Sequence, residues 1–216
     1  MSTQQLIETA VSVNALRFGN FTLKSGRESP YFFNAGAFCT GKALSVLAKA
    51  YAEKIYALQN ALAIEVLYGP AYKGIPLVAA VATQLYQDYG LDLPWAFNRK
   101  EAKNHGEGGV LVGADVRGKQ VLLIDDVLTA GTAIRESLAL LENYDAKACA
   151  VVGALDRAEV LRDGKSAIQL FNEETKLPMH SLLHFQDLLA FVRHQADFSP
   201  HLESLEAYRA KYGAMS

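Results

Sequence analysis

The chain has 216 residues, of which 50% are apolar and 20% are charged, and its formal net charge at pH 7 is −2. This length accommodates one α/β domain with a decorated edge, and the near-neutral charge argues against a nucleic-acid partner. The sequence has no apolar run near the ~18 residues that span a bilayer and no signal-peptide start, so it predicts a cytoplasmic protein without a membrane partner.

The amino-terminal part of the chain has helical and strand-like patterns. Apolar residues recur at helical spacing over residues 3–16, and aromatic-rich runs at 21–23 and 31–33 flank a polar loop. A second helical pattern covers residues 41–58. We therefore expect a helix, two short strands and a second helix in this region.

From residue 64 onward, strand and helix patterns alternate. Strands are predicted at 64–68, 93–97, 121–124 and 148–155, with helices at 75–89 and 134–142 between them. This alternation predicts a parallel sheet with right-handed crossovers. Residues 166–171 are predicted to add an edge strand, and residues 179–210 to form helices that pack over the core or join the amino-terminal cap.

The most informative motif is V-L-L-I-D-D-V-L-T-A-G-T-A, at residues 121–133. Four apolar residues before two acids predict a buried parallel strand whose carboxyl end presents Asp125 and Asp126 to a ligand crevice. The Thr/Gly-rich turn that follows supplies hydroxyls and backbone N–H groups at a helix start, which suits a phosphate. Carboxylates beside an anion site fit a sugar phosphate. A Walker B strand is the alternative, but no G-x-x-x-x-G-K-[ST] run accompanies it.

A second candidate anion site is Y-G-P-A-Y-K-G, at residues 68–74. Small residues let the backbone approach an anion closely, and Lys73 adds a point charge for pyrophosphate. An ordinary strand-to-helix turn with a solvent-exposed lysine explains the same pattern. The position of the segment after a neighbouring predicted strand favours the functional interpretation.

The segment N-R-K-E-A-K-N-H-G-E-G-G, at residues 98–109, combines cations with glycines. Charged residues and glycines do not form a buried core, so we predict a mobile loop over residues 98–117 that closes as a lid over a polyphosphate. A solvated charged face is the alternative. The two candidate anion sites on the same sheet edge favour the lid.

Aromatic residues near a lysine form a third patch, in F-T-L-K-S-G-R at 21–27 and S-P-Y-F-F-N at 29–34. Phe32 and Phe33 could flank a flat anionic ring or belong to the core. The residues alone leave both alternatives open.

These segments, from about Phe18 to Arg157, resemble the orotate phosphoribosyltransferases, a family of type I phosphoribosyltransferases. The resemblance implies that phosphoribosyl pyrophosphate is bound by Lys24, Tyr72, Lys73, Arg99, Lys100, Lys103, His105, Asp125, Asp126, Val127, Leu128, Thr129, Ala130, Gly131, Thr132 and Ala133. It implies that orotate is bound by Phe32, Phe33, Thr129 and Arg157. A guanidinium suits this role because it binds a carboxylate in bidentate fashion, although Arg157 could also be an ordinary surface arginine.

The resemblance also implies a fold and a mechanism. The fold is the type I phosphoribosyltransferase fold, a central parallel sheet flanked by helices in a single domain over 1–216, with a hood at 1–40, an α/β core at 60–175 and the lid loop at 98–117. Asp125 and Asp126 would act on the ribose, Lys103 or His105 on the leaving group, and Mg²⁺ would be held mainly through the substrate, without direct protein ligands. The partners would be the two substrates and a second subunit, in a homodimer with shared active sites.

Two positions depart from the family pattern, and two rival functions remain. Tyr68 stands where phenylalanine is common, and Asn104 where an acid is frequent. A purine phosphoribosyltransferase would need a base pocket without the carboxylate partner that Arg157 offers. A regulator that senses phosphoribosyl pyrophosphate and binds nucleic acid would be expected to have a basic surface, which the net charge disfavours.

Overall fold

The structure, a computed structural model, describes residues 1–23, 25–103, 109–128 and 131–214, with the backbone alone for residues 102, 103, 109 and 128. In chain order, the elements are α1 (Thr3–Ser12), β1 (Leu16–Thr22), β2 (Glu28–Phe33), η1 (Ala35–Ala37), α2 (Gly41–Leu62), β3 (Val66–Gly69), α3 (Gly74–Tyr89), β4 (Trp95–Lys103), β5 (Gly109–Gly113), β6 (Gln120–Leu128), α4 (Thr132–Glu142), β7 (Lys147–Asp156), β8 (Val160–Arg162), β9 (Lys165–Ser166), α5 (Ala167–Thr175), β10 (Met179–His184), α6 (Phe185–His194), η2 (Ala196–His201) and α7 (Leu202–Tyr212). Among the described helices, none has the length and apolar character needed to cross a lipid bilayer.

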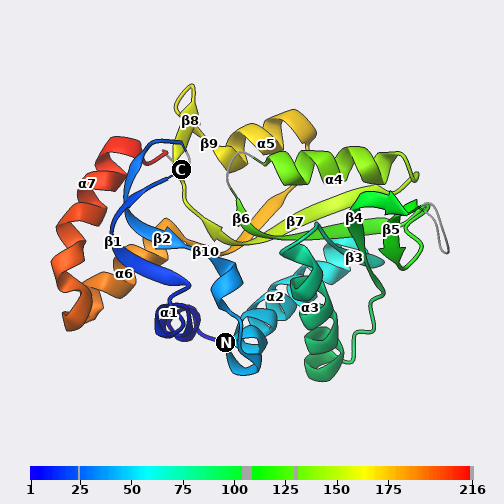
Figure 1. The fold of residues 1–216 in the computed structure, drawn as a ribbon, viewed down its shortest axis with the longest axis horizontal. Coiled ribbons are helices and arrows are strands. Elements are labelled where there is room, and N and C mark those ends of the chain that lie inside the picture. The colour runs from blue at the N-terminus through cyan, green and yellow to red at the C-terminus, as the bar shows by residue number, and fades with distance from the viewer. Residues whose placement is uncertain (24, 104–108, 129–130, 215–216) are drawn as a thin grey trace.

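A central six-stranded sheet in the described part of the chain has the order β10-β7-β6-β3-β4-β5 (Figure 1). All its neighbouring strands are parallel except β4 and β5, which pair antiparallel. Helices cover both faces, with α2 and α3 on one side and α4 and α5 on the other (Figure 1). The predicted fold class, a central parallel sheet flanked by helices, is confirmed.

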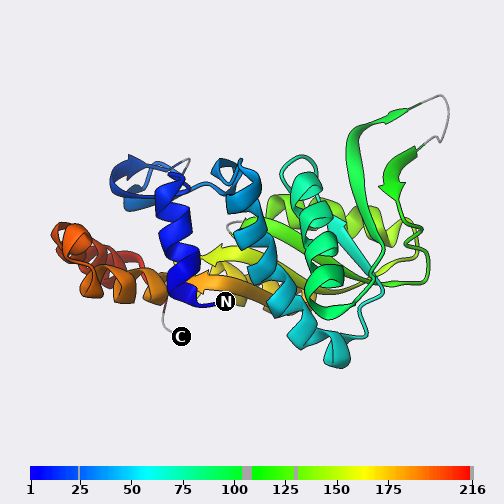
Figure 2. The ribbon, with the colours of Figure 1, turned by 90° about the horizontal axis from the view of Figure 1, so that it is seen from below.

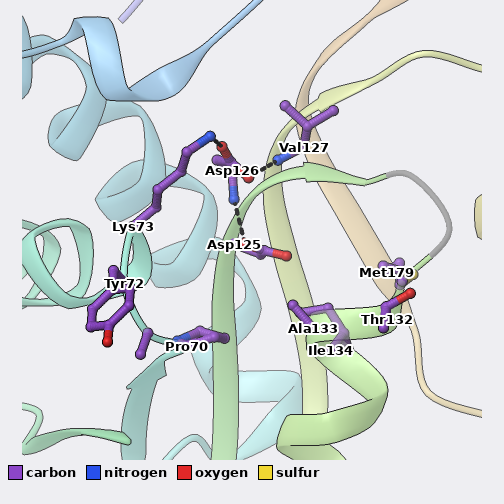
Figure 3. Close-up of a pocket in the computed structure, with 12 residues that line it drawn as sticks. Pro70, Tyr72, Lys73, Asp125, Asp126, Val127, Thr132, Ala133, Ile134 and Met179 are labelled. Atoms are coloured by element: carbon purple, nitrogen blue, oxygen red, sulfur yellow. Dashed lines mark hydrogen bonds and ion pairs between the residues drawn. The ribbon is translucent and has the colours of Figure 1, made fainter. Parts of the chain in front are cut away.

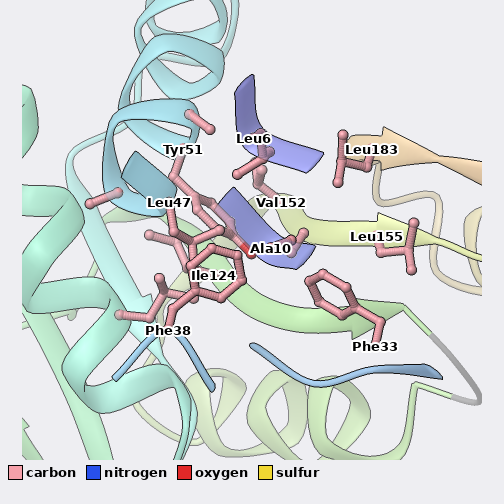
Figure 4. Packing of buried hydrophobic residues seen from close by; sticks show 14 of the residues in the cluster. Leu6, Ala10, Phe33, Phe38, Leu47, Tyr51, Ile124, Val152, Leu155 and Leu183 are labelled. Carbon is pink, nitrogen blue, oxygen red and sulfur yellow. The ribbon is translucent and has the colours of Figure 1, made fainter. Parts of the chain in front are cut away.

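Alternating side chains of β6 explain why the sheet is covered on both faces. Leu122 and Ile124 belong to the larger apolar cluster, which includes Leu47 and Tyr51 of α2 (Figure 4). Leu123 points to the other face, into a smaller cluster with residues of α4 and α5. Each of these side chains is buried, so the apolar run ahead of the two acids anchors the strand from both sides.

The first predicted helix, over 3–16, extends too far. The helix ends at Ser12, Asn14 adopts a left-handed conformation with φ of 57°, and Leu16 already pairs with Phe33 at the start of β1. The strand predicted at 21–23 is therefore the end of a longer strand. Pairing with β2 and burial of Leu16 override the helical spacing of the apolar residues.

The loop predicted over 98–117 is partly a β-hairpin. Strand β4 continues to Lys103, and β5 runs antiparallel to it, with Asn98 opposite Leu111. The ladder provides hydrogen-bond partners for backbone groups that a loop would leave to water. The hairpin and the amino-terminal elements lie at opposite ends of the sheet in both views (Figures 1 and 2). The predicted mobility of residues 98–117 stays a prediction.

Two predictions near the carboxyl end of the chain are wrong. Residues 167–175 form helix α5 instead of an edge strand, because Ser166 and Gln169 make a reciprocal capping box and Phe171 is buried against α4. Residues 179–184 form the edge strand β10, parallel to β7, where we expected a helix. Helices α6 and α7 follow, and they pack against α1 and β2 and thus join the amino-terminal cap, one of the two predicted arrangements.

Candidate active site

The two acids lie at the carboxyl edge of the parallel sheet, where β3, β6 and β7 all end. Asp125 pairs in register with Gly153 of β7, and the hydroxyl of Tyr51 in α2 donates to the Asp125 carbonyl oxygen at 2.6 Å. The sequence analysis did not single out Tyr51, because a tyrosine on a helical apolar face is ordinarily core. Its hydroxyl ties the helix to the strand at the point where the acids emerge.

Backbone groups and one lysine orient the two carboxylates (Figure 3). The Asp126 N–H donates to Asp125 Oδ1 at 2.9 Å, and the Val127 N–H donates to Asp126 Oδ1 at 2.8 Å. The Lys73 ammonium lies 2.6 Å from Asp126 Oδ2. The predicted grouping of this lysine with the acid pair is therefore what the fold produces, across 53 residues of sequence.

The environment of Asp125 favours its neutral form. Burial, followed by the adjacent charge of Asp126, raises the pKa of Asp125 from 3.8 to about 6. The Asp126 N–H and the Lys73 ammonium act in the opposite direction but do not cancel these effects. A ligand that donates hydroxyl hydrogen bonds to this carboxylate would offset the cost of keeping it ionised.

The start of α4 forms the opposite wall of the pocket. Gly131 precedes the helix in a left-handed conformation, with φ of 72°. Among the described residues, no side chain accepts a hydrogen bond from the N–H groups of the first turn. The leading N–H groups of the helix are thus available to an anion. Thr132, Ala133 and Ile134 line the pocket at this point.

The turn between β3 and α3 approaches the pocket through two facing glycines. A Cβ on Gly69 would lie 2.2 Å from the Gly74 carbonyl oxygen, so that position has no room for a side chain. The close approach places Pro70, Tyr72 and Lys73 along the wall of a pocket of about 320 Å³ (Figure 3). Tyr72 is 66% exposed, and the Lys100 ammonium lies 5.1 Å from its ring centre.

A second cavity of about 350 Å³ adjoins the first, since Pro70, Ala71 and Ala133 line both. Arg99 and Lys100 line this neighbouring cavity rather than the pocket of the acid pair. Basic side chains beside the first pocket suit an extended polyphosphate.

Asn98 connects these segments, although sequence reasoning treated it as part of a loop. Its Oδ1 accepts hydrogen bonds from the Tyr68 hydroxyl and from the Ala71 N–H, both at 2.9 Å. The Tyr68 hydroxyl thus helps to hold the strand-to-helix turn. Burial raises the pKa of Tyr68 to about 12, so the hydroxyl remains a donor at neutral pH.

Arg157 follows β7 at the same sheet edge, but it does not line the pocket of the acid pair. It is 9% exposed, and its guanidinium lies 2.6 Å from Glu159 and 4.2 Å from the ring centre of Tyr31. The alternative of an ordinary surface arginine is therefore wrong.

The adjacent phenylalanines point to opposite faces of β2, as the alternation of a strand requires. Phe33 is buried in the larger apolar cluster beside Phe38 (Figure 4). Phe32 is half-buried, with Phe21 at 5.7 Å and the Arg17 guanidinium at 5.2 Å from its ring centre. The core alternative holds for Phe33.

Some predicted site residues lie outside the described part of the chain: Lys24, His105, Thr129 and Ala130. The side chains of Lys103 and Leu128 also lie outside it. The site assignments of these residues stay predictions.

Comparison with known proteins identifies the family. Residues 40–179 match the model of the phosphoribosyl transferase domain. An orotate phosphoribosyltransferase of Dichelobacter nodosus is 54% identical, with 97% of this chain and 95% of the relative covered. The Pseudomonas aeruginosa relative of the same name is 49% identical, with 97% of each chain covered. The crystal structure of orotate phosphoribosyltransferase from Francisella tularensis aligns with a TM-score of 0.85 and 45% identity over 97% of this chain and 99% of that one. Because such identity extends over nearly the whole of each chain, this chain belongs to the orotate phosphoribosyltransferase family.

Proposed function

We propose that this protein transfers ribose 5-phosphate from phosphoribosyl pyrophosphate to orotate. The bond between the anomeric carbon and the pyrophosphate oxygen breaks, a bond to a ring nitrogen of orotate forms, and the ring N–H proton is released. The products are orotidine 5′-phosphate and pyrophosphate. The observation that carries the proposal is one pocket in which a half-buried acid pair, Lys73 and the start of α4 meet.

The roles follow from where charge develops in the reaction. Positive charge grows on the sugar as the bond breaks, and the carboxylates of Asp125 and Asp126 would stabilise it while they accept from the ribose hydroxyls. Lys73 and the N–H groups at the start of α4 would hold phosphate oxygens. No side chain has to act as a nucleophile, so positioning and electrostatics supply most of the acceleration.

The acid pair is compatible with Mg²⁺ held mainly through the substrate. The described residues contain no cluster of three or more acidic, histidine or cysteine side chains, whereas Mg²⁺ commonly uses one or two carboxylates together with substrate phosphates. Asp125 and Asp126 would hold the ribose hydroxyls of the substrate that carries the ion, so neither has to be its direct ligand. When bound, the ion neutralises the developing charge of the pyrophosphate.

Arg157 supports orotate as the acceptor base. Orotate carries a carboxylate that purine bases lack, and a buried guanidinium at the sheet edge would recognise it. The test is turnover with phosphoribosyl pyrophosphate and Mg²⁺, measured with orotate, hypoxanthine, guanine, adenine and uracil in parallel. Of these five bases, we expect only orotate to be turned over. Turnover with a purine alone would overturn the substrate, and binding of phosphoribosyl pyrophosphate without any turnover would indicate a regulator.

We also propose a cytoplasmic homodimer in which the lid of one subunit completes the other subunit's site, with Lys103 protonating the departing pyrophosphate. Support comes from the family and from the β4–β5 hairpin, which lies at the far edge of the sheet (Figure 2). The Lys103→Ala protein and the Asp125→Asn/Asp126→Asn protein should each be inactive. After equal mixing, about half of the dimers are mixed and each has one intact site of two, so about a quarter of the normal activity should return. Absence of recovery in mixed dimers contradicts sharing, and near-normal turnover of Lys103→Ala with saturating substrates excludes the lysine as proton donor.

A further inference from the structure

A buried polar cluster lies next to the acid pocket, where β2, the end of β7 and α7 meet. Glu159 accepts from Arg157 Nε at 2.6 Å through one carboxylate oxygen and pairs with Arg27 at 3.0 Å through the other. Arg157 Nη2 donates to the hydroxyl of Ser29 at 2.9 Å and to the hydroxyl of Tyr208 at 3.4 Å. Ser29, Arg157 and Tyr208 are each less than 10% exposed.

The ion pairs of this cluster do not balance its charge, because two guanidinium groups share one carboxylate. The nearby Asp156 directs its carboxylate elsewhere, to the Ala158 N–H at 2.8 Å and toward His184 at 3.6 Å. An excess of positive charge in a buried cluster favours binding of a further anion. The carboxylate of a ligand would supply it.

The contacts of Arg157 also determine which part of its guanidinium is available. Nε and Nη2 are both engaged by the protein, whereas none of the described residues accepts a hydrogen bond from Nη1. A ligand carboxylate would therefore be bound through Nη1, provided that the opposite edge of the guanidinium stays fixed.

Tyr208 contacts both the guanidinium of Arg157 and the carboxylate of Glu159. Its hydroxyl donates to Glu159 Oε1 at 2.7 Å while it accepts from Arg157 Nη2. Its ring packs against Tyr31, Phe185 and Tyr212. The chain just beyond α7 is attached to the same segment, since the Ala214 N–H donates to the Ala158 carbonyl oxygen at 2.7 Å.

We propose that Tyr208 is a positioning residue that sets the affinity for the carboxylate of the base by orienting Arg157. The inference rests on the proposed function. Loss of the hydroxyl would leave Nη2 held by Ser29 alone. It would also remove one hydrogen-bond donor from the Glu159 carboxylate, so that this carboxylate competes more strongly for Arg157. Both effects weaken binding of the ligand carboxylate. The helix α7, remote in sequence from the acid motif, thereby contributes to base specificity.

The experiment compares Tyr208→Phe with Tyr212→Phe, which removes a hydroxyl one turn later that bonds to none of the described residues. Dissociation constants are measured for orotidine 5′-phosphate and uridine 5′-phosphate, which differ only in the carboxylate on the base. We expect Tyr208→Phe to reduce the preference for orotidine 5′-phosphate about tenfold, the effect of one hydrogen bond in a charged network. Tyr212→Phe should leave the preference unchanged, and Arg157→Ala should abolish it.

A purely structural role of Tyr208 would weaken both ligands equally and leave the preference intact, which would overturn the inference. An Arg157→Ala protein that keeps the preference would overturn it as well. The orotate turnover of the unmodified protein separates the two proposals. If orotate is turned over but Tyr208→Phe keeps the full preference, the inference alone fails. If orotate is not turned over, the proposed function fails, and the inference that rests on it fails with it.

Discussion

Replacement of Asp125 by asparagine is expected to lower kcat about a thousandfold and at the same time to stabilise the folded protein. The catalytic loss is of the size found when one preorganised charge-stabilising group is removed. Asparagine has the same shape and its Oδ1 can still accept from the Asp126 N–H, so the backbone at the end of β6 is retained. The acid is thus kept for its charge and not for its packing.

The gain in stability follows from the raised pKa of Asp125. Because the folded state binds this proton more tightly than the unfolded state does, the ionised carboxylate destabilises the fold above pH 6. The penalty disappears as the pH falls from about 6 toward 3.8, where both states hold the proton. The variant should therefore exceed the unmodified protein in unfolding free energy by about 3 kcal/mol above pH 6, and by little near pH 4.

Urea denaturation from pH 4 to pH 8, together with initial rates at saturating substrates, measures both effects. Asp115→Asn is the matched control, since its carboxylate is 62% exposed beside Arg117 in the connection that precedes β6. The control should keep normal turnover. Equal stability of Asp125→Asn and the unmodified protein above pH 6 would contradict the assignment of a buried, unfavourable charge.

Replacement of Arg157 by alanine is expected to lower kcat/KM for orotate between a hundredfold and a thousandfold, the range for truncating one partner of a buried charge pair. The KM for phosphoribosyl pyrophosphate should change less than about threefold, because the arginine does not line the pocket of the acid pair. The variant therefore separates recognition of the base from recognition of the sugar phosphate.

The same variant should remain folded. Glu159 would keep Arg27 at 3.0 Å and the Tyr208 hydroxyl at 2.7 Å, so no carboxylate is left buried without a partner. The loss of packing on Tyr31 is expected to cost about 2 kcal/mol in a thermal unfolding experiment. Arg162→Ala, at a side chain that is 68% exposed, is the control. A parallel loss of affinity for both substrates would indicate a structural role and contradict base recognition.

The sequence determined the parts of the site that are contiguous in the chain. An apolar run, an acid pair and a Thr/Gly-rich turn predict a strand, a carboxyl edge and a helix start, because each step depends on local backbone preferences. The pattern of Y-G-P-A-Y-K-G likewise indicated a close backbone approach, which the facing glycines Gly69 and Gly74 provide. Alternation of strands and helices was sufficient to predict the parallel sheet.

Local patterns failed where pairing with a distant strand decided the conformation. Leu16 belongs to a strand because β2 pairs with it, and residues 179–184 form an edge strand because β7 offers unpaired backbone groups there. The capping box at Ser166, by contrast, is a local signal for the start of helix α5. Apolar periodicity alone did not distinguish these cases, because short apolar runs fit both a strand and a helix.

The tertiary structure alone decided how the charged groups of the site are paired. The sequence indicated Lys73, the acid pair and Arg157 as functional residues, but not that Lys73 would bind Asp126 or that Glu159 and Tyr208 would hold the arginine. Lys73 and Asp126 are 53 residues apart, and Arg157 and Tyr208 are 51 residues apart, so no local pattern links these two pairs. Ion pairs and hydrogen bonds depend on distances of a few ångströms in a buried setting, and those distances are set only when helices, sheet and cap pack together.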